Sequence, residues 1–205
     1  RVVEVAGVSM GSPVLGRLAR DVRLARLAAA ALGTARVQLL QDTVFIKPAR
    51  TGGPVAWHQD GSYFAFLRPL HGLALRVALT PCTPASGCLR VVDGSHRWGL
   101  VTGDLSFRAT SVDDILGALP EPLREQARRA TVEVPLEPGD VSLHHCLTLH
   151  ASGPNRSTST RKTLAIRYVD PACTVDPARV PHDAAARVPF DDAMHLSTDA
   201  YPLVG

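Results

Sequence analysis

Apolar residues recur at helical spacing near the start of the chain. Between residues 12 and 33 they return in steps of three and four, which places them on one face of a helix. Ser12 is a favourable N-cap for this helix, and Gly33 is a favourable stop. A second helical stretch covers residues 111–130, where two prolines divide it into two short helices. We therefore expect one long helix and one broken helical pair.

Most of the remaining chain has the pattern of short β-strands. Apolar and β-branched residues gather or alternate in segments that are bounded by Gly, Pro, Ser or Thr. The predicted strands cover residues 36–46, 73–80, 88–92, 131–136, 141–149 and 163–169. From about residue 171 the sequence predicts irregular structure. Many short strands separated by turns are typical of a sandwich or barrel, so we expect a mainly β fold with helices packed outside it.

Composition limits the class of protein. The 205 residues are 45% hydrophobic and 20% charged, which is typical of one globular domain. We expect residues 1–205 to form that single domain. Because the sequence begins with Arg1 rather than Met, we also expect its N-terminal part to be truncated. The sequence has no apolar run of membrane-spanning length and no signal-peptide pattern, which excludes a membrane partner.

Charge and cysteine usage point the same way. The net charge is +3, and no concentrated basic patch is visible, so we expect no nucleic-acid partner. The four cysteines form no CxxC pair and show no zinc-site spacing. They are Cys82, Cys88, Cys146 and Cys173. We interpret them as reduced core thiols in a cytoplasmic protein.

The segment Trp57-His58-Gln59-Asp60 carries the clearest candidate chemistry. His58 and Asp60 are two positions apart, so on an extended segment their side chains leave on the same side. An imidazole and a carboxylate are two corners of the two-histidine, one-carboxylate site that non-haem Fe(II) oxygenases use. Most HxD pairs are structural or lie on the surface, so this pair needs a third ligand.

The third ligand can come from His144, His145 or His150. His150 is favoured because Arg161 follows it by 11 residues, across a predicted strand–loop–strand hairpin. Such an arginine would point into the same cavity, where its buried charge needs an anionic partner. A dicarboxylate cosubstrate supplies that partner, because a guanidinium matches a carboxylate with two parallel hydrogen bonds. We therefore interpret His144 and His145 as strand residues, one inward and one outward.

Four stretches of the chain resemble the phytanoyl-CoA dioxygenase family of Fe(II)/2-oxoglutarate oxygenases. They are QDTVFIKP, WHQDGSYF, TPASGCLRVVDGSHR and LEPGDVSLHHCLTLHASGPNRSTSTRKTLAIRY. They occur in the family order from about residue 38 to 168. The resemblance implies a double-stranded β-helix, a jelly-roll or cupin-like barrel. It also implies that His58, Asp60 and His150 bind Fe(II).

The resemblance also implies a site for the cosubstrate 2-oxoglutarate. Arg161 would hold the distal carboxylate, with help from the Ser152 hydroxyl. Gln41 stands at the position of a family glutamine that hydrogen-bonds the cosubstrate. Three coordination positions of the iron would stay open: 2-oxoglutarate would take two of them, and O2 would take the third. Ascorbate would serve as the reductant in vitro.

The substrate pocket is less well specified. Tyr63, Phe64 and Phe66 follow the HxD segment, so they either line the pocket or belong to the core. Arg76 stands where some family members carry an aromatic residue at the pocket wall. It either faces outward or holds an anionic group of the substrate. A second departure is Asp93, which replaces the proline of the family's Pro-Gly-Ser-His turn.

We expect an enzyme that hydroxylates a C–H bond of a small-molecule or carrier-bound substrate, in bacterial secondary metabolism. Halogenation is disfavoured because Asp60 is present. Desaturation, epimerisation or cyclisation would use the same ligands and stay open as alternatives. A binding barrel without turnover is the alternative from another functional class. The sequence does not indicate the oligomeric state.

Overall fold

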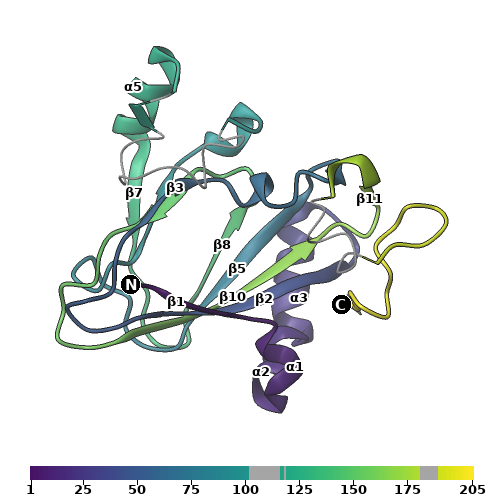
Figure 1. Ribbon diagram of the computed structural model, residues 1–205, viewed down its shortest axis with the longest axis horizontal. Coiled ribbons are helices and arrows are strands. Elements are labelled where there is room, and N and C mark those ends of the chain that lie inside the picture. Colours follow the sequence, from purple (N-terminus) through teal and green to yellow (C-terminus); the bar gives the residue numbers. More distant parts are fainter. Residues whose placement is uncertain (102–115, 118, 181–188) are drawn as a thin grey trace.

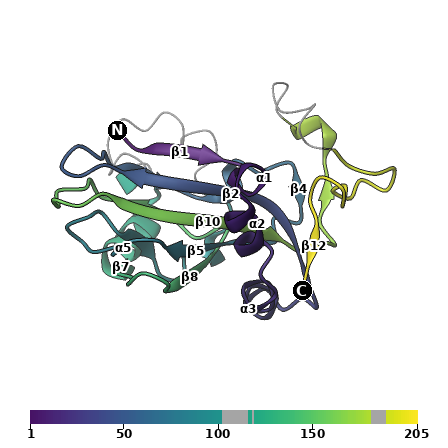
Figure 2. The same cartoon turned by 90° about the horizontal axis from the view of Figure 1, so that it is seen from below.

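Two antiparallel sheets organise the chain in the computed structural model, which describes residues 1–101, 116–117, 119–180 and 189–205. The larger sheet consists, in spatial order, of β1 (Val3–Ala6), β2 (Val37–Lys47), β10 (Arg161–Val169), β5 (Gly72–Ala78) and β8 (Val141–His145). Figure 2 shows these five strands side by side. The short strand β12 (Leu203–Val204) pairs with β2 as well.

The smaller sheet faces the inner side of the larger one across a cavity that residues of both sheets line. Its order is β3 (Val55–His58), β9 (His150–Ser152), β6 (Leu89–Val92) and β7 (Thr131–Val134). A separate ribbon joins β4 (Leu67–Arg68) to β11 (Thr174–Val175). The arrangement is a jelly-roll barrel of the double-stranded β-helix type, as predicted.

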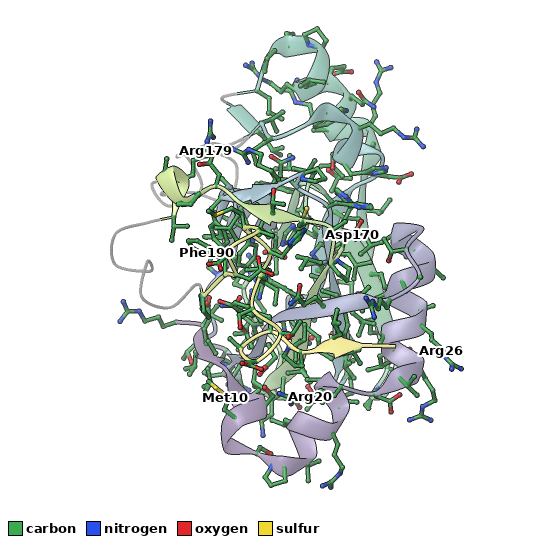
Figure 3. All side chains as sticks on the ribbon, turned by 90° about the vertical axis from the view of Figure 1, so that its right-hand side faces the viewer. Met10, Arg20, Arg26, Asp170, Arg179 and Phe190 are labelled. Carbon is green, nitrogen blue, oxygen red and sulfur yellow. The ribbon has the colours of Figure 1, made fainter. Side chains whose placement is uncertain are left out.

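Helices cover the outer face of the larger sheet (Figures 1 and 2). They are α1 (Val8–Gly11), α2 (Pro13–Ala19) and α3 (Val22–Leu32). The apolar face of α3 packs with the outward residues of β10 in one core cluster. Arg26 extends from α3 away from the sheet, as the polar face of the helix predicts (Figure 3).

The single helix predicted for residues 12–33 is interrupted. Ser12 caps α2, and Gly33 ends α3 with a φ of 71°, as expected. Between them, α2 ends at Ala19, and the side chain of Asp21 caps a new helix by accepting from the Arg23 amide. An aspartate favours a helix start over a helix interior, which explains the break.

The strand predicted for residues 141–149 is shorter than expected. β8 ends at His145, the chain turns, and β9 begins at His150 in the other sheet. The six predicted strands are all present with shifted ends. The short β1, β3, β4, β9, β11 and β12 were missed because too few residues carry the pattern. The described part of the tail beyond residue 171 holds only short elements and is otherwise irregular, as predicted.

Helix α5 (Glu121–Ala130) is the later half of the predicted helical pair, and most of the earlier half lies outside the described residues. Three 3-10 helices complete the described elements: η1 (Asp60–Ser62), η2 (Ser95–Trp98) and η4 (Pro177–Arg179). Within the described part of the chain, none of the helices has the length and apolar character needed to cross a membrane.

Strand β10 contributes side chains to both faces of the larger sheet. Leu164, Ile166 and Tyr168 are fully buried against the helices. The alternate residues Arg161 and Arg167 line the cavity between the sheets instead. Because side chains alternate along a strand, one segment supplies both the outer core and charged groups for the cavity.

The core on the helix side is expected to carry much of the stability. Ile166→Ala should lower the free energy of unfolding by about 2–5 kcal/mol, because it leaves a cavity in a fully buried region. Val132→Ala removes a side chain that is 48% exposed, and it should change the free energy of unfolding by less than about 0.5 kcal/mol. Urea unfolding followed by circular dichroism measures both, and equal losses would contradict this assignment of the core.

Candidate metal and cosubstrate site

A cavity of about 540 Å³ lies between the two sheets. Its polar lining includes Glu4, Gln41, His58, Tyr63, Arg76, His150, Ser152, Arg161 and Arg167. The larger sheet therefore contributes arginines, and the smaller sheet contributes histidines.

His58, Asp60 and His150 come together at this cavity. One ligand atom from each lies within 4.8 Å of the others, and no other such group of three occurs among the described residues. The two histidines are direct partners across β3 and β9, and their ring centroids are 4.1 Å apart. Asp60 follows in η1, immediately after β3. Strand pairing thus joins ligands that are 92 positions apart in the sequence.

Both imidazoles are oriented for metal binding. Nδ1 of His58 lies 2.8 Å from the carbonyl oxygen of Ala56, and Nδ1 of His150 lies 2.9 Å from that of Thr148. A hydrogen bond to a carbonyl places the proton on Nδ1 and leaves the Nε2 lone pair free for a metal. Burial lowers the pKa of both histidines, which keeps them neutral. This donor set fits Fe(II).

The charge on Asp60 is also favoured by its surroundings. Its burial opposes ionisation, but Arg167 and the neighbouring histidines outweigh that effect and hold the pKa of Asp60 well below its usual range. Among these histidines, His144 has its Nε2 3.7 Å from Oδ2 of Asp60, and its ring centroid is 4.4 Å from that of His150. His144 therefore faces inward beside the three candidate ligands, without belonging to their group.

Sequence reasoning missed Arg167. Its guanidinium contacts both carboxylate oxygens of Asp60, at 3.2 Å from Nε and 3.1 Å from Nη2. It also donates from Nη1 to Oε1 of Gln41 at 3.0 Å. The sequence holds one sign of this placement: Arg167 stands six positions after Arg161, so both face the same side of the strand.

Arg161 has the surroundings of an anion site. Its side chain is buried, one Nη donates to the carbonyl oxygen of Gly87, and its Nε has no hydrogen-bond partner among the described residues. Ser152 lines the same cavity. Lys47 is the register partner of Arg161, and burial lowers its pKa to about 7. The described part of the chain gives Arg161 no carboxylate partner, so the guanidinium is available to a ligand.

Arg76 faces the cavity rather than the outside. Its Nη2 donates to Oγ1 of Thr163 at 2.9 Å, and its guanidinium lies 5.2 Å from the ring centroid of Phe45. Burial lowers the pKa of Arg76 to about 10, with repulsion from Arg161 as the next cause. No ion pair joins Arg76 to an acidic residue in the portion of the chain that is described.

The three aromatic residues that follow the HxD segment lie in two different places. Tyr63 and Phe64 line the cavity, as one of the two interpretations predicted. Phe66 does not line this cavity: it is 5% exposed and packs with Leu40 and Leu67 in a separate apolar cluster. It immediately precedes β4 in the sequence. All four cysteines are free and buried, as predicted.

Known proteins resemble this chain in sequence. The family model described as phytanoyl-CoA dioxygenase (PhyH) matches residues 2–163. An ectoine dioxygenase of Sphingopyxis alaskensis is 32% identical over 166 residues, which cover 77% of this chain and 54% of that protein. A probable alpha-ketoglutarate-dependent hypophosphite dioxygenase of Stutzerimonas stutzeri is 31% identical over 64% of this chain and 45% of its own length. The chain spans about half the length of these relatives.

Solved structures agree on the fold. The non-heme alpha ketoglutarate dependent carbocyclase SnoK superposes with a TM-score of 0.79 over the whole chain and 76% of SnoK, at 24% identity. The epimerase SnoN, crystallised with Fe3+, alpha ketoglutarate and nogalamycin RO, reaches 0.76 at 27% identity, over 98% of this chain and 78% of SnoN. Together with the family match and the geometry of the cavity, these likenesses show that the chain belongs to the phytanoyl-CoA dioxygenase family.

Proposed function

We propose that this chain is an Fe(II)- and 2-oxoglutarate-dependent dioxygenase that hydroxylates a C–H bond of a small molecule. The observation that carries the proposal is the convergence of His58, Asp60 and His150 beside the cavity that Arg161 lines. Arg161 has no carboxylate partner among the described residues. The bound iron would supply activation of O2, driven by conversion of 2-oxoglutarate to succinate and CO2. The protein's part is to hold the ligands, orient both substrates and exclude water.

The candidate metal ligands and two residues of the cavity have proposed tasks. His58 and His150 present neutral Nε2 atoms, and Asp60 presents a charged oxygen, so together they hold one dication. Arg161 would hold the distal carboxylate of 2-oxoglutarate, and the Ser152 hydroxyl would donate to the same group.

The substrate would meet a different part of the cavity. Tyr63 and Phe64 would form its apolar wall, close to the candidate metal ligands. Of the three cavity arginines, Arg167 is paired with Asp60, and Arg161 is assigned to the cosubstrate. Arg76 is left without an acidic partner among the described residues, so we assign it to an anionic group of the substrate.

A biological setting belongs to the proposal as well. SnoN and SnoK come from nogalamycin biosynthesis, which supports a role in bacterial secondary metabolism. Four free buried thiols support a reducing compartment, the cytoplasm. The epimerase and carbocyclase among the structural relatives keep those outcomes as alternatives to hydroxylation.

Turnover without the native substrate tests the reaction class. The purified chain, supplied with Fe(II), ascorbate and 2-oxoglutarate under air, should release succinate at a slow rate, and His150→Ala should abolish this. His145→Ala is the matched control, because His145 is a nearby histidine outside the proposed metal site, and it should retain the activity. Metal binding without any succinate would favour a barrel that binds but does not turn over.

The assignment of Arg161 has its own test. Arg161→Ala should raise the KM for 2-oxoglutarate by about 10- to 100-fold, because a hydrogen-bonded ion pair contributes about 1.5–3 kcal/mol. The amount of iron bound at saturation should not change. A KM equal to that of the unaltered chain would place the distal carboxylate elsewhere.

The assignment of Arg76 to the substrate makes an opposite prediction. Arg76→Met should change the anaerobic affinity for 2-oxoglutarate by no more than about twofold, because Arg76 is not assigned to the cosubstrate. A twofold change corresponds to less than about 0.5 kcal/mol. The charge-transfer absorption of the iron complex reports this affinity directly. A large loss of affinity in Arg76→Met would instead assign Arg76 to the cosubstrate.

A further inference from the structure

Arg167 uses its guanidinium to join two groups of the proposed site. Two of its nitrogens contact the two carboxylate oxygens of Asp60, and the third donates to Oε1 of Gln41. The side chain is 13% exposed and lies 5.9 Å from the ring centroid of Phe64, measured at Cζ. Every nitrogen of the fork therefore has a partner, and both partners line or adjoin the cavity.

The two partners reach Arg167 from different sheets. Gln41 is its direct neighbour on β2, across the pair that β2 forms with β10. Asp60 arrives from η1, which follows β3 of the smaller sheet. Arg167 is consequently a point at which the two sheets are tied together beside the candidate metal ligands.

The contact also fixes the orientation of the Gln41 amide. A guanidinium has donors and no acceptor, so only the oxygen of the amide can face Arg167. The amide nitrogen of Gln41 must then point elsewhere, and Gln41 lines the cavity. The side chain therefore offers two N–H donors to a ligand there, and a carboxylate is a matching acceptor.

We propose that Arg167 is a positioning residue that couples the metal site to the cosubstrate site. It holds the Asp60 carboxylate in one rotation for the metal and holds the Gln41 amide with its donors toward 2-oxoglutarate. This inference rests on the proposed function. It adds that the two binding events depend on one guanidinium, which need not touch either ligand.

A lysine would not perform this task. An ammonium group could reach Asp60, but it lacks the planar fork that spans a carboxylate on one edge and an amide on the other. The two contacts can therefore be separated by substitution. Arg167→Met removes both, whereas Arg167→Lys keeps a charge beside Asp60 and loses the bridge to Gln41.

Binding measurements without turnover test the coupling. Anaerobic calorimetry with Co(II) gives the metal affinity, and the charge-transfer absorption of the Fe(II) complex gives the affinity for 2-oxoglutarate. Arg167→Met should weaken metal binding by about 10- to 100-fold, the usual effect of losing a group that orients a ligand. Arg167→Lys should keep the metal affinity within about tenfold and still weaken 2-oxoglutarate binding.

A double-mutant cycle tests the bridge itself. Gln41→Leu should weaken 2-oxoglutarate binding in the unaltered chain, and much less in Arg167→Lys, because the amide has already lost its orientation there. Additive effects would overturn the inference. Arg90→Met is the control. Arg90 is on β6, its guanidinium lies over the ring of Trp57, and it does not line the cavity, so its loss should change neither affinity.

The outcomes separate this inference from the proposed function. If the unaltered chain binds neither Co(II) nor 2-oxoglutarate, the proposed function fails, and the coupling fails with it. If it binds both, and folded Arg167→Met and Arg167→Lys bind them equally well, only the coupling is overturned. Thermal unfolding identifies variants that are folded, and Arg167→Lys carries the test if Arg167→Met does not fold.

Discussion

A buried carboxylate is the constraint on which this site depends. Asp60 is 2% exposed, and an isolated charge at such a position is very unfavourable. The protein meets the cost with the guanidinium of Arg167 and with a ring of histidines around the carboxylate. The same surroundings that keep Asp60 charged also keep His58 and His150 neutral, since burial penalises any further positive charge. One desolvated cluster thus prepares all three candidate ligands in the protonation states that a metal requires.

The barrel accommodates this charged cluster because it keeps apolar packing and charged groups on opposite faces of the larger sheet. The helix side of β10 buries Leu164, Ile166 and Tyr168, and the Tyr168 hydroxyl donates to the carbonyl oxygen of Ala19. The cavity side of the same strand carries Arg161 and Arg167, whose charges would be intolerable in the outer core. The strand alternation therefore allows stability and chemistry to be supplied by consecutive residues, with neither compromising the other.

Charge is distributed unevenly within the cavity. Arg76, Arg161 and Arg167 line it, whereas the exposed Glu4 is the one acidic residue of its described lining. The Asp60 carboxylate lies next to the cavity, against Arg167. The proposed dianionic cosubstrate would balance part of this excess, and an acidic substrate would balance more. The cavity thus favours anionic ligands before any specific contact is considered, through the field of its walls.

The sequence alone determined the alternation of the strands, the capping residues at Ser12 and Gly33, and the candidate ligands, because these depend on local spacing and residue type. It did not determine the break at Asp21, where one capping side chain competes with a continuous apolar face. Nor did it reveal that His145 and His150 lie in different sheets, since the turn between them has no proline or glycine.

Only the tertiary structure showed Arg167 beside Asp60. These residues are 107 positions apart, and an arginine six positions beyond another on a strand has no local property that names its partner. It also placed Arg76 in the cavity and Phe66 outside it. Local pattern fixes which side of a strand a residue occupies, but the pairing of strands and the facing of sheets decide what that side meets.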